Sequence, residues 1–118
     1  MNIKPWIQAA RLRTLPLATT CVLLGGAVAR AHGLDEASLS RFNPVIFSAA
    51  ITVILLQILA NFANDYGDFI KGTDTAAGRQ DRALASGQMT VSSVKKGVVV
   101  SAISAFIAGI VTLILAFV

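Results

Sequence analysis

Side chains that build polar active sites are scarce in this sequence. Its 118 residues include one cysteine and one histidine, and only 14% of them are charged. The single cysteine, Cys21, excludes an internal disulfide framework and a metal site built on thiolates. Hydrophobic residues make up 55% of the chain, and the mean hydropathy of +0.72 lies well outside the range of ordinary soluble domains. A chain this short cannot bury so much apolar surface in its own core, so we expect it to lie in a lipid bilayer.

The apolar residues gather in three stretches that predict an all-α, polytopic membrane protein. We place the spans at about 11–31, 44–64 and 97–118, because each is close to the length that crosses a bilayer and none alternates as barrel strands do. Just before the first stretch Trp6 can sit at headgroup level, and within the stretch Pro16 is expected to kink or restart the helix. The dipeptide Asn43-Pro44 is a good helix start and is expected to open the second span.

Basic residues at the ends of these stretches predict the topology. The net charge is +4, but the cations form no stripe with interleaved aromatic residues, so we expect no nucleic-acid partner. The positive-inside rule places the N-terminus and residues 64–96 in the cytoplasm and residues 30–43 outside. It rests on three groups of cations, Lys4, Arg11 and Arg13, then Arg30 and Arg41, then Lys71, Arg79, Arg82, Lys95 and Lys96.

Two further features concern the first and third stretches. The first has an alternative interpretation as a signal peptide, because a basic start and an apolar core precede the small residues Ala27-Val28-Ala29. In the third, Ser101, Ala105 and Gly109 follow one another at intervals of four residues. Small residues at this spacing are typical of a face on which membrane helices pack closely.

A polar stripe begins inside the second stretch. Gln57, Asn61, Asn64 and Asp68 fall on one narrow side of a helix, with Asp65 at its edge. Polar groups at membrane depth are kept mainly where they meet water, a partner or a ligand, so we expect this stripe to face a cavity. The alternative is a helix end whose Asn and Asp side chains are solvated among the lipid headgroups.

Carboxylates concentrate just beyond the stripe, and they indicate a cation site. On an unbroken helix Asp68 and Asp74 would point about 120° apart, so we expect Gly72 to break the helix and let them converge. Carboxylates without histidine or thiolate suit a hard cation, and Mg²⁺ in proteins is commonly held by one or two of them together with phosphate oxygens. Neither an EF-hand loop nor a Walker loop is present.

Arg79 and Arg82 follow the carboxylates. Arginine matches the planar oxygens of phosphate better than lysine does. Carboxylates and arginines at the cytoplasmic mouth of a lipid-exposed cavity therefore indicate a lipid-like ligand with a phosphate or diphosphate head. The alternative is that both arginines only anchor the topology.

The segment Asn64-Asp65-Tyr66-Gly67-Asp68 resembles the first Asp-rich motif, N-D-x-x-D, of the UbiA superfamily of intramembrane prenyltransferases. The next aspartate, Asp74, and the segments 6–18 and 82–87 are similar to the branch that prenylates 1,4-dihydroxy-2-naphthoate in menaquinone biosynthesis. Gln80-Asp81 stands where that branch often carries Gly-Pro. The resemblance makes residues 1–118 the N-terminal part of a larger UbiA-type helical bundle, with a second Asp-rich motif later in the family's sequence. By that resemblance we expect the chain alone to be inactive.

The resemblance implies Mg²⁺-dependent transfer of a prenyl chain from a polyprenyl diphosphate to the aromatic acceptor, in the inner cell membrane. Asp68 and Asp74 would be catalytic. The implied metal ligands are Asn64, Asp65, Asp68 and Asp74, and the implied substrate-binding residues are Asn61, Asn64, Lys71, Arg79, Arg82 and Arg13. Two alternatives stay open: a UbiA-type enzyme with another acceptor such as 4-hydroxybenzoate, and a non-enzymatic membrane transport or binding protein.

Overall fold

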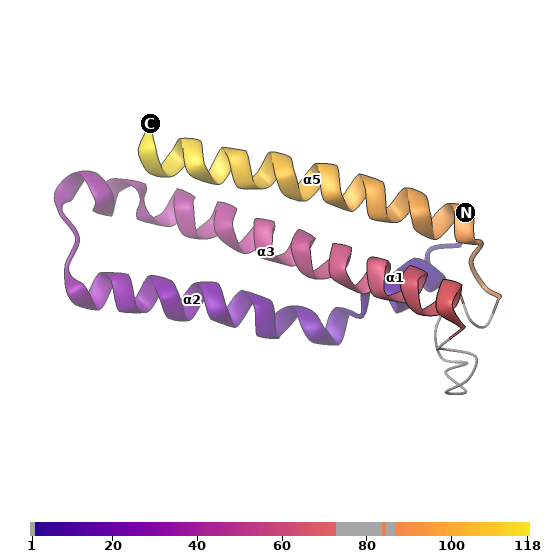
Figure 1. Ribbon diagram of the computed structural model, residues 1–118. Coiled ribbons are helices and arrows are strands. Elements are labelled where there is room, and N and C mark those ends of the chain that lie inside the picture. The colour runs from indigo at the N-terminus through magenta and orange to yellow at the C-terminus, as the bar shows by residue number, and fades with distance from the viewer. Residues whose placement is uncertain (1, 73–83, 85–86) are drawn as a thin grey trace.

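In the computed structural model, which describes residues 2–72, 84 and 87–118, the chain is a bundle of antiparallel helices (Figure 1). Its elements are α1 (Lys4–Ala10), the 3-10 helix η1 (Leu12–Thr14), α2 (Leu15–His32), α3 (Glu36–Lys71) and α5 (Val91–Phe117). Three helical stretches are long and apolar enough to cross a membrane, Lys4–His32, Glu36–Lys71 and Val91–Phe117. The predicted all-α, multi-pass membrane architecture is therefore confirmed.

Helix α3 is the centre of the bundle. It packs against α2 on one side and α5 on the other, and the molecule measures 54 × 24 × 23 Å (Figure 1). The N-terminus, the end of α3 and the start of α5 all lie at one end of the bundle, which we call the polar end. The α2–α3 connection and Val118 lie at the opposite end. This arrangement agrees with a topology in which the N-terminus and the segment after α3 share one side of the membrane.

We expected the first span to run from about residue 11, but the chain there is not one continuous helix. Helix α1 ends at Ala10, Arg11 adopts the left-handed conformation with φ of 51°, and α2 begins only at Leu15. Pro16 lies in the first turn of α2, where its missing N–H removes no helical hydrogen bond. Pro16 thus restarts the helix as predicted, while the break falls upstream at Arg11.

The prediction that the helix of the second span starts at Asn43-Pro44 was wrong. Helix α3 begins at Glu36, and Pro44 lies inside it. The start is fixed by Asp35, whose side chain accepts a hydrogen bond of 2.8 Å from the backbone N–H of Ser38. An aspartate N-cap satisfies one of the unpaired N–H groups of the first turn, so the helix can start eight residues before the proline.

The small-residue face predicted on the third span is confirmed. Ser101 and Ala105 are buried, and an added Cβ at Gly109 would lie 3.8 Å from the Thr52 side chain on α3. Further along the same interface, the Oγ atom of Ser48 and the Oγ1 atom of Thr112 are 2.6 Å apart. Small residues let the backbones of α3 and α5 approach, and the hydroxyl pair links the two helices.

At the polar end, aromatic and aliphatic residues form the core. Trp6 on α1 meets Phe62 on α3 in an edge-to-face contact, with ring centroids 5.6 Å apart. Buried neighbours complete the cluster, namely Ala9, Ala10, Leu84, Met89 and Val94. Helix α1 is therefore packed against α3 instead of standing free at the bundle's edge.

Candidate functional site

The polar residues of α3 divide between two faces of the helix. Asn61 and Asp65 are buried, with exposed fractions of 3% and 1%. Asn64 is exposed and Asp68 is half-buried. The sequence placed Asp65 at the edge of a stripe that runs through Gln57, Asn61, Asn64 and Asp68. The structure instead centres the buried face on Asn61 and Asp65, which point toward the N-terminal segment, and leaves Asn64 and Asp68 on a second face.

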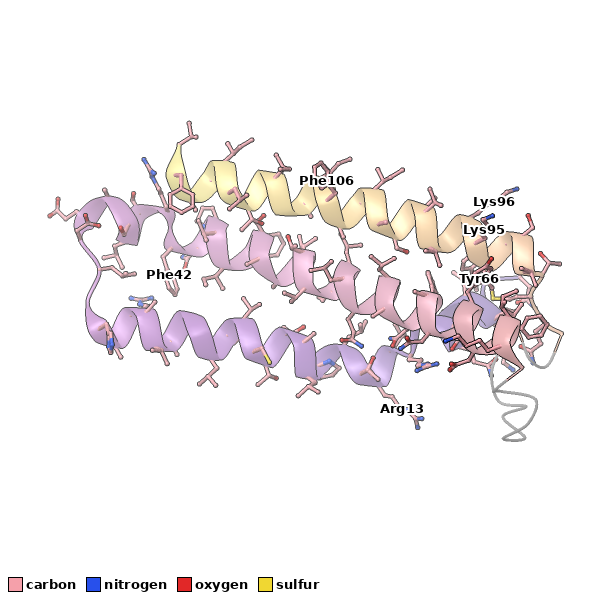
Figure 2. The ribbon with its side chains drawn as sticks, viewed as in Figure 1. Arg13, Phe42, Tyr66, Lys95, Lys96 and Phe106 are labelled. Atoms are coloured by element: carbon pink, nitrogen blue, oxygen red, sulfur yellow. The ribbon has the colours of Figure 1, made fainter. Side chains whose placement is uncertain are left out.

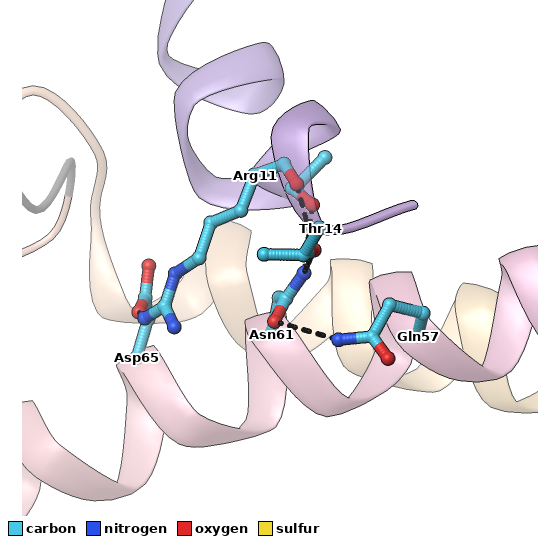
Figure 3. Close-up of polar contacts among 6 residues, drawn as sticks. Arg11, Thr14, Gln57, Asn61 and Asp65 are labelled. Atoms are coloured by element: carbon cyan, nitrogen blue, oxygen red, sulfur yellow. Dashed lines mark hydrogen bonds and ion pairs between the residues drawn. The ribbon is translucent and has the colours of Figure 1, made fainter. Parts of the chain in front are cut away.

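Asn61 binds the corner of the chain at residues 10–14, where α1 ends and η1 follows. Its side-chain Nδ2 donates hydrogen bonds to the backbone carbonyl oxygen of Ala10 at 2.8 Å and to Oγ1 of Thr14 at 3.1 Å. Its Oδ1 accepts a hydrogen bond of 3.4 Å from Nε2 of Gln57 (Figure 3). The Ala10 carbonyl lies in the last turn of α1, where carbonyl groups have no hydrogen-bond partner within the helix. In this structure Asn61 thus binds the chain's own backbone.

Asp65 is bound by Arg11. The Nη2 group of Arg11 donates to Oδ1 of Asp65, with exposed side-chain fractions of 22% and 2% (Figure 3). Removing one partner of a buried ion pair leaves an uncompensated charge and typically costs about 3–5 kcal/mol. The left-handed backbone at Arg11 costs of order 1–2 kcal/mol. The ion pair and the bonds of Asn61 to the same corner offset this cost.

From the sequence, Arg11 was expected only to indicate the topology, and its contact with Asp65 was not predicted. A signal for it existed, because an ionisable residue within a membrane span usually pairs with another charged group. Arg13, which we expected on the acceptor side, is exposed, and Figure 2 shows its side chain pointing away from α3. The arginine that reaches the polar face of α3 is Arg11.

Helix α3 ends at Lys71, directly before the glycine that was expected to break it between Asp68 and Asp74. Gly72 adopts a left-handed conformation with φ of 74°, and its N–H bonds to the carbonyl oxygen of Phe69 at 3.1 Å. Glycine takes this conformation without steric cost. The predicted break at Gly72 is confirmed, and the exposed Lys71 is the last residue of the helix.

Three predicted site residues, Asp74, Arg79 and Arg82, lie outside the described residues. Within the described ranges, no group of three or more His, Cys, Asp or Glu side chains is close enough to hold a metal ion. What these ranges provide on the second face of α3 is the amide of Asn64 and the carboxylate of Asp68. Oxygen donors of this kind suit Mg²⁺, which needs few protein ligands when phosphate oxygens complete its shell.

Two hollows in the bundle differ in their lining. At the polar end a cavity of about 230 Å³ lies between Trp6, Met89 and Thr90. Between α3 and α5 an almost wholly apolar groove of about 460 Å³ is lined by residues that include Val53, Leu56, Phe106 and Ile110. Such a groove suits a hydrocarbon chain, whereas the polar end offers carboxylate, amide and ammonium groups.

The chain is similar over most of its length to proteins named as prenyltransferases. The chain is 34% identical over 110 residues to the 1,4-dihydroxy-2-naphthoate octaprenyltransferase of Haemophilus influenzae, which covers 92% of this chain and 34% of that protein. It is 33% identical over 111 residues to the Escherichia coli protein of the same name, covering 89% of this chain and 32% of the relative. A UbiA prenyltransferase domain-containing protein 1 homolog of Drosophila melanogaster is 35% identical over 95 residues, 80% of this chain and 25% of the relative.

The chain spans about a third of the length of the bacterial relatives that it matches. No protein-family model matches it, and no solved structure does. The similarity extends over most of this chain, so the resemblance to UbiA-type prenyltransferases first indicated by the Asp-rich motif is confirmed.

Proposed function

We propose, on the premise that the chain is similar over 92% of its length to a UbiA-type prenyltransferase, that it acts in the transfer of a polyprenyl chain from polyprenyl diphosphate to 1,4-dihydroxy-2-naphthoate. This would be a step of menaquinone biosynthesis. The observation that supports the proposal most strongly is that bacterial relatives of about one-third identity carry this acceptor in their names. The polar end of the bundle also carries an amide, a carboxylate and an ammonium group, from Asn64, Asp68 and Lys71.

The residues proposed to hold Mg²⁺ are Asn64, Asp68 and Asp74. The donor chemistry fits, because Asn64 and Asp68 offer oxygen atoms from one face of α3 and Gly72 turns the chain directly after them. When bound, the ion neutralises the diphosphate and stabilises the charge that develops on its leaving oxygens. Asp65 was also expected to be a ligand, but its carboxylate is bound by Arg11.

The cations near this end are proposed to bind the substrates' charged groups. Lys71 at the end of α3, with Arg79 and Arg82 in the following segment, would contact the diphosphate. Arg13 stays a proposal for the acceptor side and would have to turn from its outward position. The apolar groove between α3 and α5 could take the isoprenoid chain.

The proposed location is the inner cell membrane, with the N-terminus and residues 64–96 in the cytoplasm. It is supported by the shared end of the bundle on which the N-terminus, the end of α3 and the start of α5 lie (Figure 1), and by the cations gathered in these segments. Both substrates would then meet the protein at the cytoplasmic leaflet.

The test measures prenylation by membranes that contain the complete gene product carrying this chain. With Mg²⁺ and a polyprenyl diphosphate, we expect prenylated product from 1,4-dihydroxy-2-naphthoate, and less from 4-hydroxybenzoate offered in parallel. Asp68→Ala and Asp74→Ala should each abolish turnover. Unchanged turnover and metal dependence in both variants would contradict the proposal. A preference for 4-hydroxybenzoate would move it to another UbiA-type acceptor, and no product with either would favour a transport or binding protein.

A further inference from the structure

We propose that Asp65, although it lies inside the Asn-Asp-x-x-Asp motif, is a positioning residue that holds the N-terminal segment 4–14 onto α3 through Arg11. Metal ligation then falls to Asn64 and Asp68 on the neighbouring face. The anchoring role stands on contacts within the chain and needs no assumption about activity. The division of labour within the motif rests on the proposed function.

Helix geometry places the motif residues and the preceding Asn61 in two pairs. Asn61 and Asp65 are four residues apart and so share one face of α3, and Asn64 and Asp68 are likewise four apart and share another. At about 100° per residue the second face is turned roughly 60–100° from Asp65. Burial follows the same division, because Asn61 and Asp65 are buried whereas Asn64 is exposed and Asp68 is half-buried.

The buried pair holds one structural feature, the corner at Arg11. Asp65 binds the Arg11 side chain, and Asn61, one turn earlier, binds the carbonyl oxygen of Ala10 and the hydroxyl of Thr14. The Thr14 hydroxyl in turn donates to the carbonyl oxygen of Arg11 at 2.8 Å. Every one of these bonds joins α3 to the corner or closes the corner on itself. The face is thus built to seat the N-terminal segment.

Seating this segment determines where Trp6 lies. Its ring packs on Phe62 and reaches Gly97 on α5, so the segment bridges the two helices. If Asp65 were to ligate a cation, the cation would compete with the Arg11 guanidinium for the carboxylate, and the corner would lose its partner. Anchoring and ligation are therefore mutually exclusive roles for this side chain in the arrangement observed.

The chain's single tryptophan makes the two roles separable. The 118-residue chain, reconstituted in lipid nanodiscs, would be examined by acrylamide quenching of Trp6 fluorescence and, in parallel, by Mn²⁺ binding followed by electron paramagnetic resonance. Mn²⁺ serves as the spectroscopic probe for the magnesium site. Circular dichroism would confirm that each variant keeps its helices.

We expect Asp65→Asn to raise the quenching constant of Trp6 at least about twofold and leave Mn²⁺ affinity within about threefold of the parent. The matched control Asp68→Asn should do the reverse, weakening Mn²⁺ binding by about tenfold or more with unchanged quenching. Exchanging the charges, Arg11→Asp with Asp65→Arg, should restore the parent's quenching, because aspartate tolerates the left-handed conformation at position 11.

Two results would overturn the inference: quenching that does not change in Asp65→Asn, or a loss of Mn²⁺ affinity in Asp65→Asn as large as in Asp68→Asn. If the parent chain binds no Mn²⁺, the proposed metal site fails, and with it the division of labour. The quenching of Trp6 in the single and exchanged variants still decides the anchoring role in that case.

Discussion

The Trp6 ring lies so close to Gly97 that a Cβ atom added at position 97 would be 2.6 Å from Cζ3 of the indole. This contact joins the first helix to α5 across a gap that only a hydrogen atom fits. Glycine at this position therefore has a packing reason, and its φ is not positive.

Gly97→Ala should displace Trp6 and destabilise the polar end. Overpacking typically costs about 1–3 kcal/mol, and the better helix propensity of alanine returns up to about 1 kcal/mol. We expect a lower thermal midpoint in detergent and a red-shifted Trp6 emission. Gly25→Ala on α2 is the control, since nothing lies within 4 Å of an added Cβ there. Equal midpoints for the two variants would show that the Trp6 contact is not tight.

Asn61→Ala should destabilise the bundle by about 1–3 kcal/mol, because the Ala10 carbonyl oxygen is left without a partner in a buried place. Asn64→Ala, three residues on at an exposed position, should leave the free energy of unfolding nearly unchanged. Denaturant titration followed by helical circular dichroism measures both. The order of the two variants would be reversed if Asn64, and not Asn61, held the N-terminal segment.

Thr112→Val keeps the shape of the side chain but removes the hydroxyl that meets Ser48 and Thr52. Hydrogen bonds between membrane helices average about 0.6 kcal/mol, so we expect a small loss of that order in the free energy of unfolding. The control is Thr20→Val on α2, whose hydroxyl bonds within its own helix to the Pro16 carbonyl oxygen. A loss of several kcal/mol would mean that the hydroxyl cluster holds α3 and α5 together more strongly than packing does.

The start of α3 should depend on pH through Asp35. The hydrogen bonds from Ser38 hold the pKa of the Asp35 carboxyl below its ordinary value. A carboxyl whose pKa is lowered by folding stabilises the helix fully above its unfolded pKa of about 3.9, and this contribution is lost as the pH falls through the lowered value. The protection factor of the Ser38 amide against exchange, taken relative to the intrinsic rate at each pH, should therefore fall below about pH 4. Asp35→Asn, which caps without a charge, should remove that pH dependence.

Much of the architecture could be predicted from local sequence. Hydropathy located three membrane-crossing helices, the spacing of Ser101, Ala105 and Gly109 identified the face that packs on α3, and Gly72 marked the end of that helix. Helix starts were less predictable. The helix starts after Asp35 and not at Asn43-Pro44, because the Asp35 side chain satisfies an unpaired N–H group of the first turn. A proline merely has no N–H group to satisfy. The metal set of Asn64, Asp68 and Asp74 stays a prediction, with Asp74 outside the described residues, and Asp65, which the sequence also placed in that set, is bound by Arg11.

By itself, then, the sequence determined what depends on neighbours along the chain: which segments are apolar enough to span a bilayer, where a glycine ends a helix, and which polar residues share a face of α3. Only the tertiary structure decided which of those faces looks inward. Asp65 belongs to Arg11, a partner 54 residues away, and the helical period that puts Asp65 near Asn64 and Asp68 contains no information about what packs against it. The packing of the N-terminal segment on α3 brings Arg11 to the Asp65 carboxylate.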